Sequence, residues 1–260
     1  MTSIPLAATP APSLARSSTG VDQDSLGRSV AFHLLPGLGG LAALLLTAPI
    51  LAALGWPMLF AFYGPMSATV VAVEGALLVR ERRRRTASGD TRRLVDLRGS
   101  LSLPRLTALA VGLFAGGIVL SGVLSVVDRA LVTGVFAGLP SWWLVSDATA
   151  VLDSPRGLLV VTFAVGLVMN VFVGPIVEES YFRGYLLPRI SRLGWRAPVV
   201  NAVLFSVYHF WQPWALVSRL GYVLPYVVAV HRTRSVALGM VVHSAANLLG
   251  LLVLVSLAFR

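Results

Sequence analysis

The chain of 260 residues is 56% hydrophobic and only 12% charged, and its mean hydropathy is +0.80. This composition is too apolar for a soluble domain and predicts a polytopic membrane protein.

The formal net charge of +10 would suit a nucleic-acid-binding protein. However, the basic residues are all arginines that cluster beside apolar segments, where they set topology and meet anionic lipid headgroups. We therefore expect membrane lipids as partners and no nucleic acid. The lack of cysteine excludes disulfides, thiolate metal sites and a cysteine nucleophile.

Residues 1–30 are predicted to form a disordered cytoplasmic tail, because the segment is rich in Ser, Thr, Pro and Ala and has no signal-peptide pattern. Residues 31–260 then form the transmembrane domain. Two apolar spans are expected over 32–54 and 57–79. Glu74 lies near the inner end of the second span, where it is predicted to pair with Arg80 at the helix end.

The arginine-rich segment 80–85 marks the cytoplasmic side of the membrane by the positive-inside rule, so the N-terminus is predicted to be cytoplasmic. The bias toward arginine over lysine favours a bacterial protein and thus a bacterial cytoplasmic membrane. A third span is expected over 106–127. Residues 131–151 are predicted to be a loop or surface-lying helix, because another crossing would place the later arginines on the outer face.

The fourth span, 157–187, contains Gly174-Pro175, where the proline is predicted to kink the helix. Three more spans are expected: one over 197–210, one that follows the turn 211–214 and ends near 230, and one over 236–257. The predicted fold is therefore an all-α bundle of about seven transmembrane helices, within the range of six to eight.

Two carboxylates and a guanidinium lie inside the fourth span, at Glu178, Glu179 and Arg183. Placing a charged side chain at the centre of a span costs roughly 2.5 to 3.5 kcal/mol of insertion free energy. The three charged residues therefore need either ion-pair partners or a functional role. Glu179 and Arg183 are four residues apart and can form a helical ion pair. Glu178 then lies about 100° round the helix and is left for chemistry. The alternative is a buried salt-bridge cluster that fixes helix packing.

Polar side chains also occur in two later spans, at His209 and at His243 with Asn247. At a rise of about 1.5 Å per residue, Glu178, His209 and His243 lie roughly 15, 18 and 12 Å from the cytoplasmic ends of their helices. These depths agree, so we expect one shared cavity. A single histidine in an apolar helix would more often be a hydrogen-bonded structural residue.

Such a cavity suits hydrolysis by an activated water. Glu178 could accept a proton from a water held by His209, while His243 and Asn247 donate hydrogen bonds to the oxyanion. The rival hypothesis is a zinc ion bound by Glu178, His209 and His243. The cofactor is therefore either zinc or none, and the HExxH pattern of helical zinc proteases does not occur.

Three sequence motifs, in this order and spacing, resemble those of the CPBP intramembrane protease family. They are Glu178-Glu179-Ser180-Tyr181-Phe182-Arg183-Gly184, Phe205-Ser206-Val207-Tyr208-His209 and His243-Ser244-Ala245-Ala246-Asn247. The family includes CAAX prenyl endopeptidases of the Rce type and bacteriocin-processing or immunity relatives of the Abi group.

The resemblance covers about residues 159–257 and implies a catalytic core over 157–257. It implies a helical membrane endopeptidase that cleaves a membrane-associated or lipidated peptide or protein. The implied site residues are Glu178, Glu179, Arg183, His209, His243 and Asn247.

Two other functions remain open. In a proton-coupled small-molecule transporter, Glu178 and the histidines would form a proton relay. The sequence shows no pair of broken helices in two corresponding halves, which is the pattern typical of transporters. The second alternative is a non-catalytic bacteriocin immunity or scaffold protein of the same family.

Overall fold

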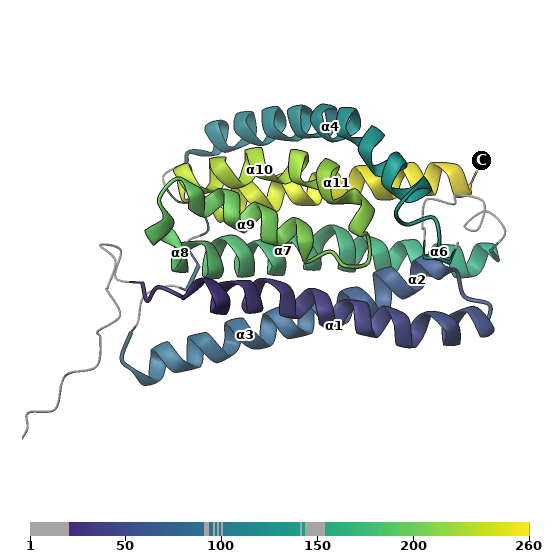
Figure 1. Cartoon of the computed structure of the whole chain (residues 1–260), viewed down its shortest axis with the longest axis horizontal. Helices are drawn as coiled ribbons and strands as arrows, with labels where there is room; N and C mark the ends of the chain where they lie inside the picture. The colour runs from purple at the N-terminus through teal and green to yellow at the C-terminus, as the bar shows by residue number, and fades with distance from the viewer. Residues whose placement is uncertain are drawn as a thin grey trace, which may run out of the picture.

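A computed structural model of the protein describes residues 21–90, 94–95, 97, 99, 101–140, 142–143 and 154–259. These residues form an all-α bundle without a β-strand (Figure 1). Six of the helices among them are long and apolar enough to cross a membrane. The prediction of a polytopic helical bundle is therefore confirmed. A shorter apolar helix, α9 (Arg196–Val207), adds a further segment where a span was expected.

The long helices cover the predicted apolar segments, although the first begins six residues earlier and the second ends eight residues later than expected. The first helix is α1 (Leu26–Ala53), and the second span consists of α2 (Met58–Ala61), the π turn η1 (Phe62–Met66) and α3 (Ser67–Ala87). After α4 (Leu103–Thr133), the next span consists of α6 (Arg156–Gly166), the π turn η2 (Leu167–Val173), α7 (Gly174–Glu179), the π turn η3 (Ser180–Leu186) and α8 (Leu187–Arg189). The chain then continues with α9, α10 (Leu216–Thr233) and α11 (Val236–Ala258). Short 3₁₀ turns flank α9, namely η4 (Ser191–Leu193) and η5 (Pro213–Ala215).

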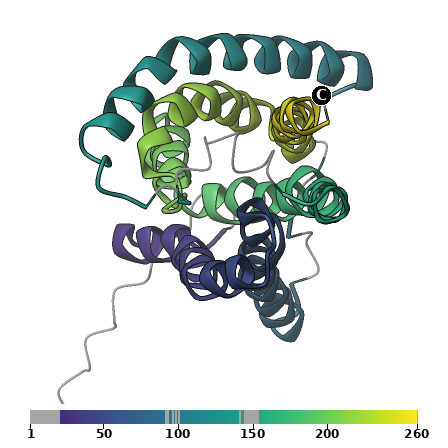
Figure 2. The same cartoon turned by 90° about the vertical axis from the view of Figure 1, so that its right-hand side faces the viewer.

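The helices form layers on either side of α7 (Figures 1 and 2). Helices α1 and α3 pack against each other on one side, and α9, α10 and α11 lie on the other. Helix α4 crosses the outside of α10 and α11. Because α7 contacts both α3 and α11, the charged motif that it carries is enclosed by protein instead of lipid.

Helix α1 begins inside the segment that we expected to be a disordered tail. Ser25 caps the helix, and its hydroxyl accepts a hydrogen bond from the Arg28 amide. Asp24 is 4% exposed and forms ion pairs with Arg28 and Arg189. Burial raises the pKa of Asp24, although both arginines oppose the shift. Residues 21–30 are thus attached to the bundle, while residues 1–20 lie outside the described residues.

Glu81 joins the end of α3 to α8. Its carboxylate lies 2.6 Å from Arg189 Nη2 and also accepts hydrogen bonds from Arg84 and Arg85. The arginine-rich segment therefore does more than set topology, because part of it neutralises a carboxylate that holds two helices together. Of the segment 131–151, residues 131–133 extend α4 and 134–140 form turns, whereas residues 144–151 fall outside the described part of the chain.

The predicted kink at Gly174-Pro175 coincides with a π turn. The 34-residue helix Arg156–Arg189 continues through this point, and η2 ends at Val173, directly before the two residues. A π turn adds one residue to a helical turn and often marks a functional site. Each of the three π turns has a main-chain carbonyl that accepts a side-chain hydrogen bond. The pairs are Ser67 Oγ to Phe62 O, Asn247 Nδ2 to Asn170 O and Asn201 Nδ2 to Phe182 O.

Candidate active site

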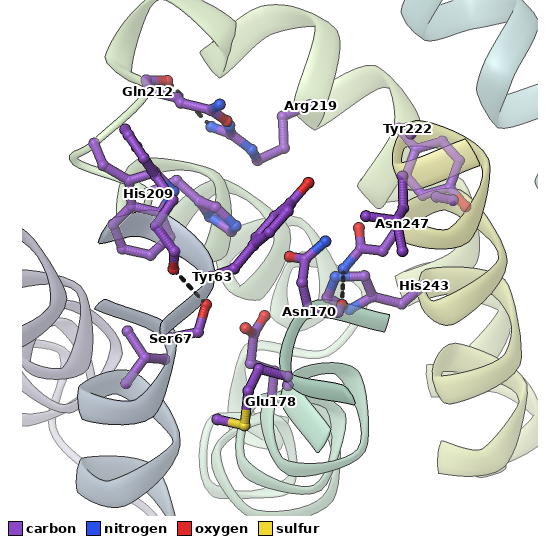
Figure 3. Close-up of a pocket in the computed structure, with 18 of the residues that line it drawn as sticks. Tyr63, Ser67, Asn170, Glu178, His209, Gln212, Arg219, Tyr222, His243 and Asn247 are labelled. Carbon is purple, nitrogen blue, oxygen red and sulfur yellow. Dashed lines mark hydrogen bonds between the residues drawn. The ribbon is translucent and has the colours of Figure 1, made fainter. Parts of the chain in front are cut away.

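A cavity of about 750 Å³ opens between α3, α7, α10 and α11. Four of the six predicted site residues line this cavity and lie around it in Figure 3, namely Glu178, His209, His243 and Asn247. The other two, Glu179 and Arg183, are buried behind the wall. The shared cavity that we predicted from the helix depths is therefore present.

Glu179 and Arg183 form the predicted ion pair, with 3.2 Å between Arg183 Nε and Glu179 Oε2 and both side chains fully buried. Tyr226 of α10 joins the pair, because its hydroxyl accepts from Arg183 Nη2 at 2.8 Å and donates to Glu179 Oε1 at 3.1 Å. Arg183 also stacks over the Phe205 ring at 4.0 Å from its centroid. The pair therefore connects η3 to α9 and α10.

His243 is oriented by the same carboxylate. Its Nδ1 lies 3.1 Å from Glu179 Oε1, and because a carboxylate only accepts hydrogen bonds, Nδ1 carries a proton. Nε2 is then the ring nitrogen left for a ligand. It accepts a hydrogen bond in the neutral imidazole and donates one in the imidazolium. The predicted donation from His243 to an oxyanion thus depends on Glu179.

His209 follows the end of α9 in a turn, where its ring contacts Phe205 at 4.9 Å between centroids. Its Nδ1 lies 2.8 Å from the Phe205 carbonyl, which can only accept, so this nitrogen also carries the proton. Nε2 is left with a lone pair, so it can accept a hydrogen bond from a water molecule.

The Glu178 carboxylate has a buried oxygen, Oε2, for which no hydrogen-bond partner occurs among the described residues. The Tyr208 hydroxyl lies near it but outside hydrogen-bonding geometry. This contrasts with Glu179, whose carboxylate contacts three side chains. The separation of roles predicted from the i, i+4 spacing is thus present, with one glutamate paired and the other facing the cavity.

Asn247 is attached to η2, because its Nδ2 donates a hydrogen bond of 2.7 Å to the Asn170 carbonyl. An amide nitrogen has two hydrogens, so one remains for a ligand. Asn170, Tyr63, Gln212 and Arg219 also line the cavity and were not predicted. Asn170 is recognisable only from the π turn, which the sequence pattern does not reveal.

Residues 160–249 match the model of a protein family described as type II CAAX prenyl endopeptidase Rce1-like. This part of the chain is Rce1-like. The match confirms the resemblance seen in the motifs, and the Rce1-like region contains all six predicted site residues. Comparison of the chain with curated proteins and with solved structures found no match. The family supports a protease, and therefore a hydrolase, embedded in a membrane.

Glu74, outside the Rce1-like region, does not pair with Arg80 as predicted. Its side chain is fully buried, and neither carboxylate oxygen has a hydrogen-bond partner within the described ranges. The charged groups that act on it are Glu178, Arg183 and Glu179. The prediction was wrong because Glu74 is directed inward, on the helix face of Val70, a cavity residue four positions earlier.

A zinc ion requires three or four nitrogen, oxygen or sulfur ligands around one point. No group of three His, Asp or Glu side chains in the described part of the protein could hold a metal ion. Both histidines use Nδ1 for hydrogen bonds to protein groups and keep Nε2 free, which is also the arrangement of histidines that bind a metal through Nε2. The described side chains thus do not converge on one point as a zinc site would require, and the choice between zinc and no metal stays a prediction.

Gly239 of α11 lies against the Glu179 carboxylate, and a methyl group at this position would collide with Glu179 Oε2. We expect Gly239→Ala to destabilise the protein by about 1–3 kcal/mol and to reduce activity, because the carboxylate that orients His243 must move. Thermal unfolding in detergent measures the change. Gly250→Ala in the same helix is the control, since no described atom lies within 4 Å of the added methyl group. An equal Tm for the two variants would contradict the close packing.

Proposed function

We propose that the protein is an intramembrane endopeptidase that hydrolyses a peptide bond of a membrane-associated or lipidated substrate. The observation that carries the proposal is that α7, the turn after α9 and α11 bring Glu178, His209, His243 and Asn247 to one cavity of an apolar bundle. An unpartnered carboxylate inside a membrane protein is a functional feature by default. The Rce1-like match supports the same class of activity.

In this mechanism a water molecule between Glu178 and His209 is the nucleophile. Glu178 accepts one of its protons, and the lone pair on His209 Nε2 accepts a hydrogen bond from its other hydrogen. The water oxygen then attacks the peptide carbonyl carbon. Glu178 subsequently passes the proton to the nitrogen of the leaving amine.

The oxyanion of the tetrahedral intermediate needs hydrogen-bond donors. The free amide hydrogen of Asn247 and Nε2–H of a protonated His243 supply them. Glu179 orients the His243 ring through Nδ1, and Arg183 with Tyr226 holds Glu179 in place. Glu179 and Arg183 thus act as positioning residues, and they do not touch the substrate.

The proposal includes a bacterial cytoplasmic membrane with the N-terminus in the cytoplasm. It is supported by the arginines that gather at the ends of α3 and α8, which an ion pair between Glu81 and Arg189 holds together. Arginines close to the ends of spans favour the cytoplasmic side.

The test uses purified protein in lipid vesicles and a panel of membrane-anchored peptides, with and without a metal chelator. We expect cleavage that is insensitive to the chelator, because the proposed water is activated by Glu178 and not by a metal. Loss of cleavage with the chelator and recovery with zinc would instead support the zinc site of Glu178, His209 and His243.

Two further outcomes would contradict the proposal. Proton-dependent solute uptake by the vesicles without peptide cleavage would favour the transporter. Protection against a bacteriocin that persists in a Glu178→Ala variant would favour the non-catalytic immunity or scaffold protein.

A further inference from the structure

Arg219, in the first turn of α10, lines the same cavity and has no part in the proposed mechanism. Figure 3 places Arg219 and Gln212 together on one wall, and Glu178 on the opposite wall. The cavity therefore has a carboxylate at one side and a guanidinium at the other.

The contacts of Arg219 are all with uncharged acceptors. Nη2 donates to Gln212 Oε1 at 2.9 Å, and Nη1 makes longer contacts of 3.5 and 3.4 Å with the carbonyls of Ser206 and Gln212. Across the described ranges, no carboxylate lies within ion-pair distance of Arg219.

Arg219 is partly buried, and the two arginines that are buried within the described ranges differ from it in this respect. Arg183 pairs with Glu179 at 3.2 Å, and Arg189 pairs with Glu81 at 2.6 Å. A guanidinium inside an apolar bundle is costly without an anion, and residues that keep such a charge commonly mark a ligand path. Asp128 and Glu178 act on Arg219 only from beyond ion-pair distance, so the ligand of the cavity could supply the direct anionic partner that Arg219 lacks among the described residues.

We propose that Arg219 binds a carboxylate of the substrate and makes the cavity selective for peptides that carry this negative charge beyond the reacting bond. The inference rests on the proposed endopeptidase function. A guanidinium presents parallel N–H donors that match the two oxygens of a carboxylate. The carboxylate belongs either to the chain terminus or to an acidic side chain, and the ligand that reaches Arg219 is the one that reaches Glu178.

A structural role for Arg219 must be separated from this binding role. Its bonds to Ser206 and Gln212 brace the turn that carries His209, so a substitution could lower all activity by disturbing that histidine. The ratio of kcat/KM for an acidic substrate to kcat/KM for a neutral one removes this effect, because damage to His209 lowers both values equally.

The experiment compares three membrane-anchored peptides of one sequence. The first ends in a carboxylate, the second in a carboxamide, and the third in a carboxamide with one aspartate replacing an asparagine. For the wild type we expect kcat/KM to be about 10- to 100-fold higher for an acidic peptide than for the neutral one, the size of a charge-assisted hydrogen bond. Preference for the first peptide alone identifies the chain terminus, and preference for the third identifies a side chain.

Arg219→Gln should bring the ratio close to one, mainly through KM, while Arg219→Lys should keep part of it. Gln212→Leu, which removes the 2.9 Å contact but leaves the cation, should preserve the ratio. A wild-type ratio near one, or an unchanged ratio in Arg219→Gln, would overturn the inference.

Binding provides a second measurement that does not need catalysis. Fluorescent versions of the three peptides are titrated against Glu178→Gln and against Glu178→Gln with Arg219→Gln. Tighter binding of an acidic peptide only when Arg219 is present supports the inference. Such binding without cleavage of any peptide by the wild type would refute the endopeptidase proposal and leave the role of Arg219 intact. Equal affinities in both proteins would refute the role of Arg219.

Discussion

Glu178→Gln is expected to lower kcat by about 10²- to 10⁴-fold, the usual contribution of a general base, while the Tm stays within a degree or two. Glutamine has the same shape but cannot accept the proton of the water. The fold should tolerate the change, because Glu178 Oε2 has no hydrogen-bond partner among the described side chains and main-chain groups. Peptide cleavage in vesicles and thermal unfolding in detergent measure the two effects.

Ser180→Ala is the matched control for this experiment. Ser180 is two residues away in the same helix, and its hydroxyl donates to the Ile176 carbonyl at 2.7 Å, so it does not serve the cavity. Its removal should leave kcat unchanged. More than a tenth of wild-type kcat in Glu178→Gln would show that another group activates the water.

Arg183→Met should be the most destabilising single change, lowering the free energy of unfolding by about 3–5 kcal/mol, because it leaves the Glu179 charge buried without its ion-pair partner. Methionine fills much of the space of the arginine stem and can still pack on Phe205. Unfolding in mixed detergents provides the measurement.

The double variant Arg183→Met with Glu179→Gln separates charge from shape. Removing both charges should restore most of the stability, since a buried pair contributes little net free energy compared with neutral groups. Activity should remain low, because His243 no longer faces a carboxylate. If Arg183→Met alone costs less than about 1 kcal/mol, the pair is hydrated and the buried network described above is absent.

The apolar pattern was sufficient to predict six of the seven spans and the shared cavity of Glu178, His209 and His243, whereas the segment expected as the span 197–210 is the shorter helix α9. The i, i+4 rule also predicted the Glu179–Arg183 pair, because η3 begins only at Ser180 and the side chains still meet across it. These inferences depend on helical period and apolar content, which are local properties of the sequence.

The unpredicted features depend on tertiary packing. Glu74 lies at the end of an apolar run and was assigned to the nearest arginine in sequence, whereas the structure directs it toward Glu178 and Arg183. Asn170 and Arg219 line a cavity whose other lining residues come from distant parts of the chain. A π turn has no distinct residue pattern, so η2 could not be predicted either.

The π turns also allow different parts of the span 156–189 to face different directions. An ordinary helix advances about 100° per residue, so one additional residue rotates everything that follows by that angle. Helix α7 lies between two such insertions, η2 and η3, and therefore has its own rotational phase. Glu178 and Glu179 can therefore keep their direction, while the lipid-facing residues before α7 and the arginine-bearing residues after it have a different rotational phase.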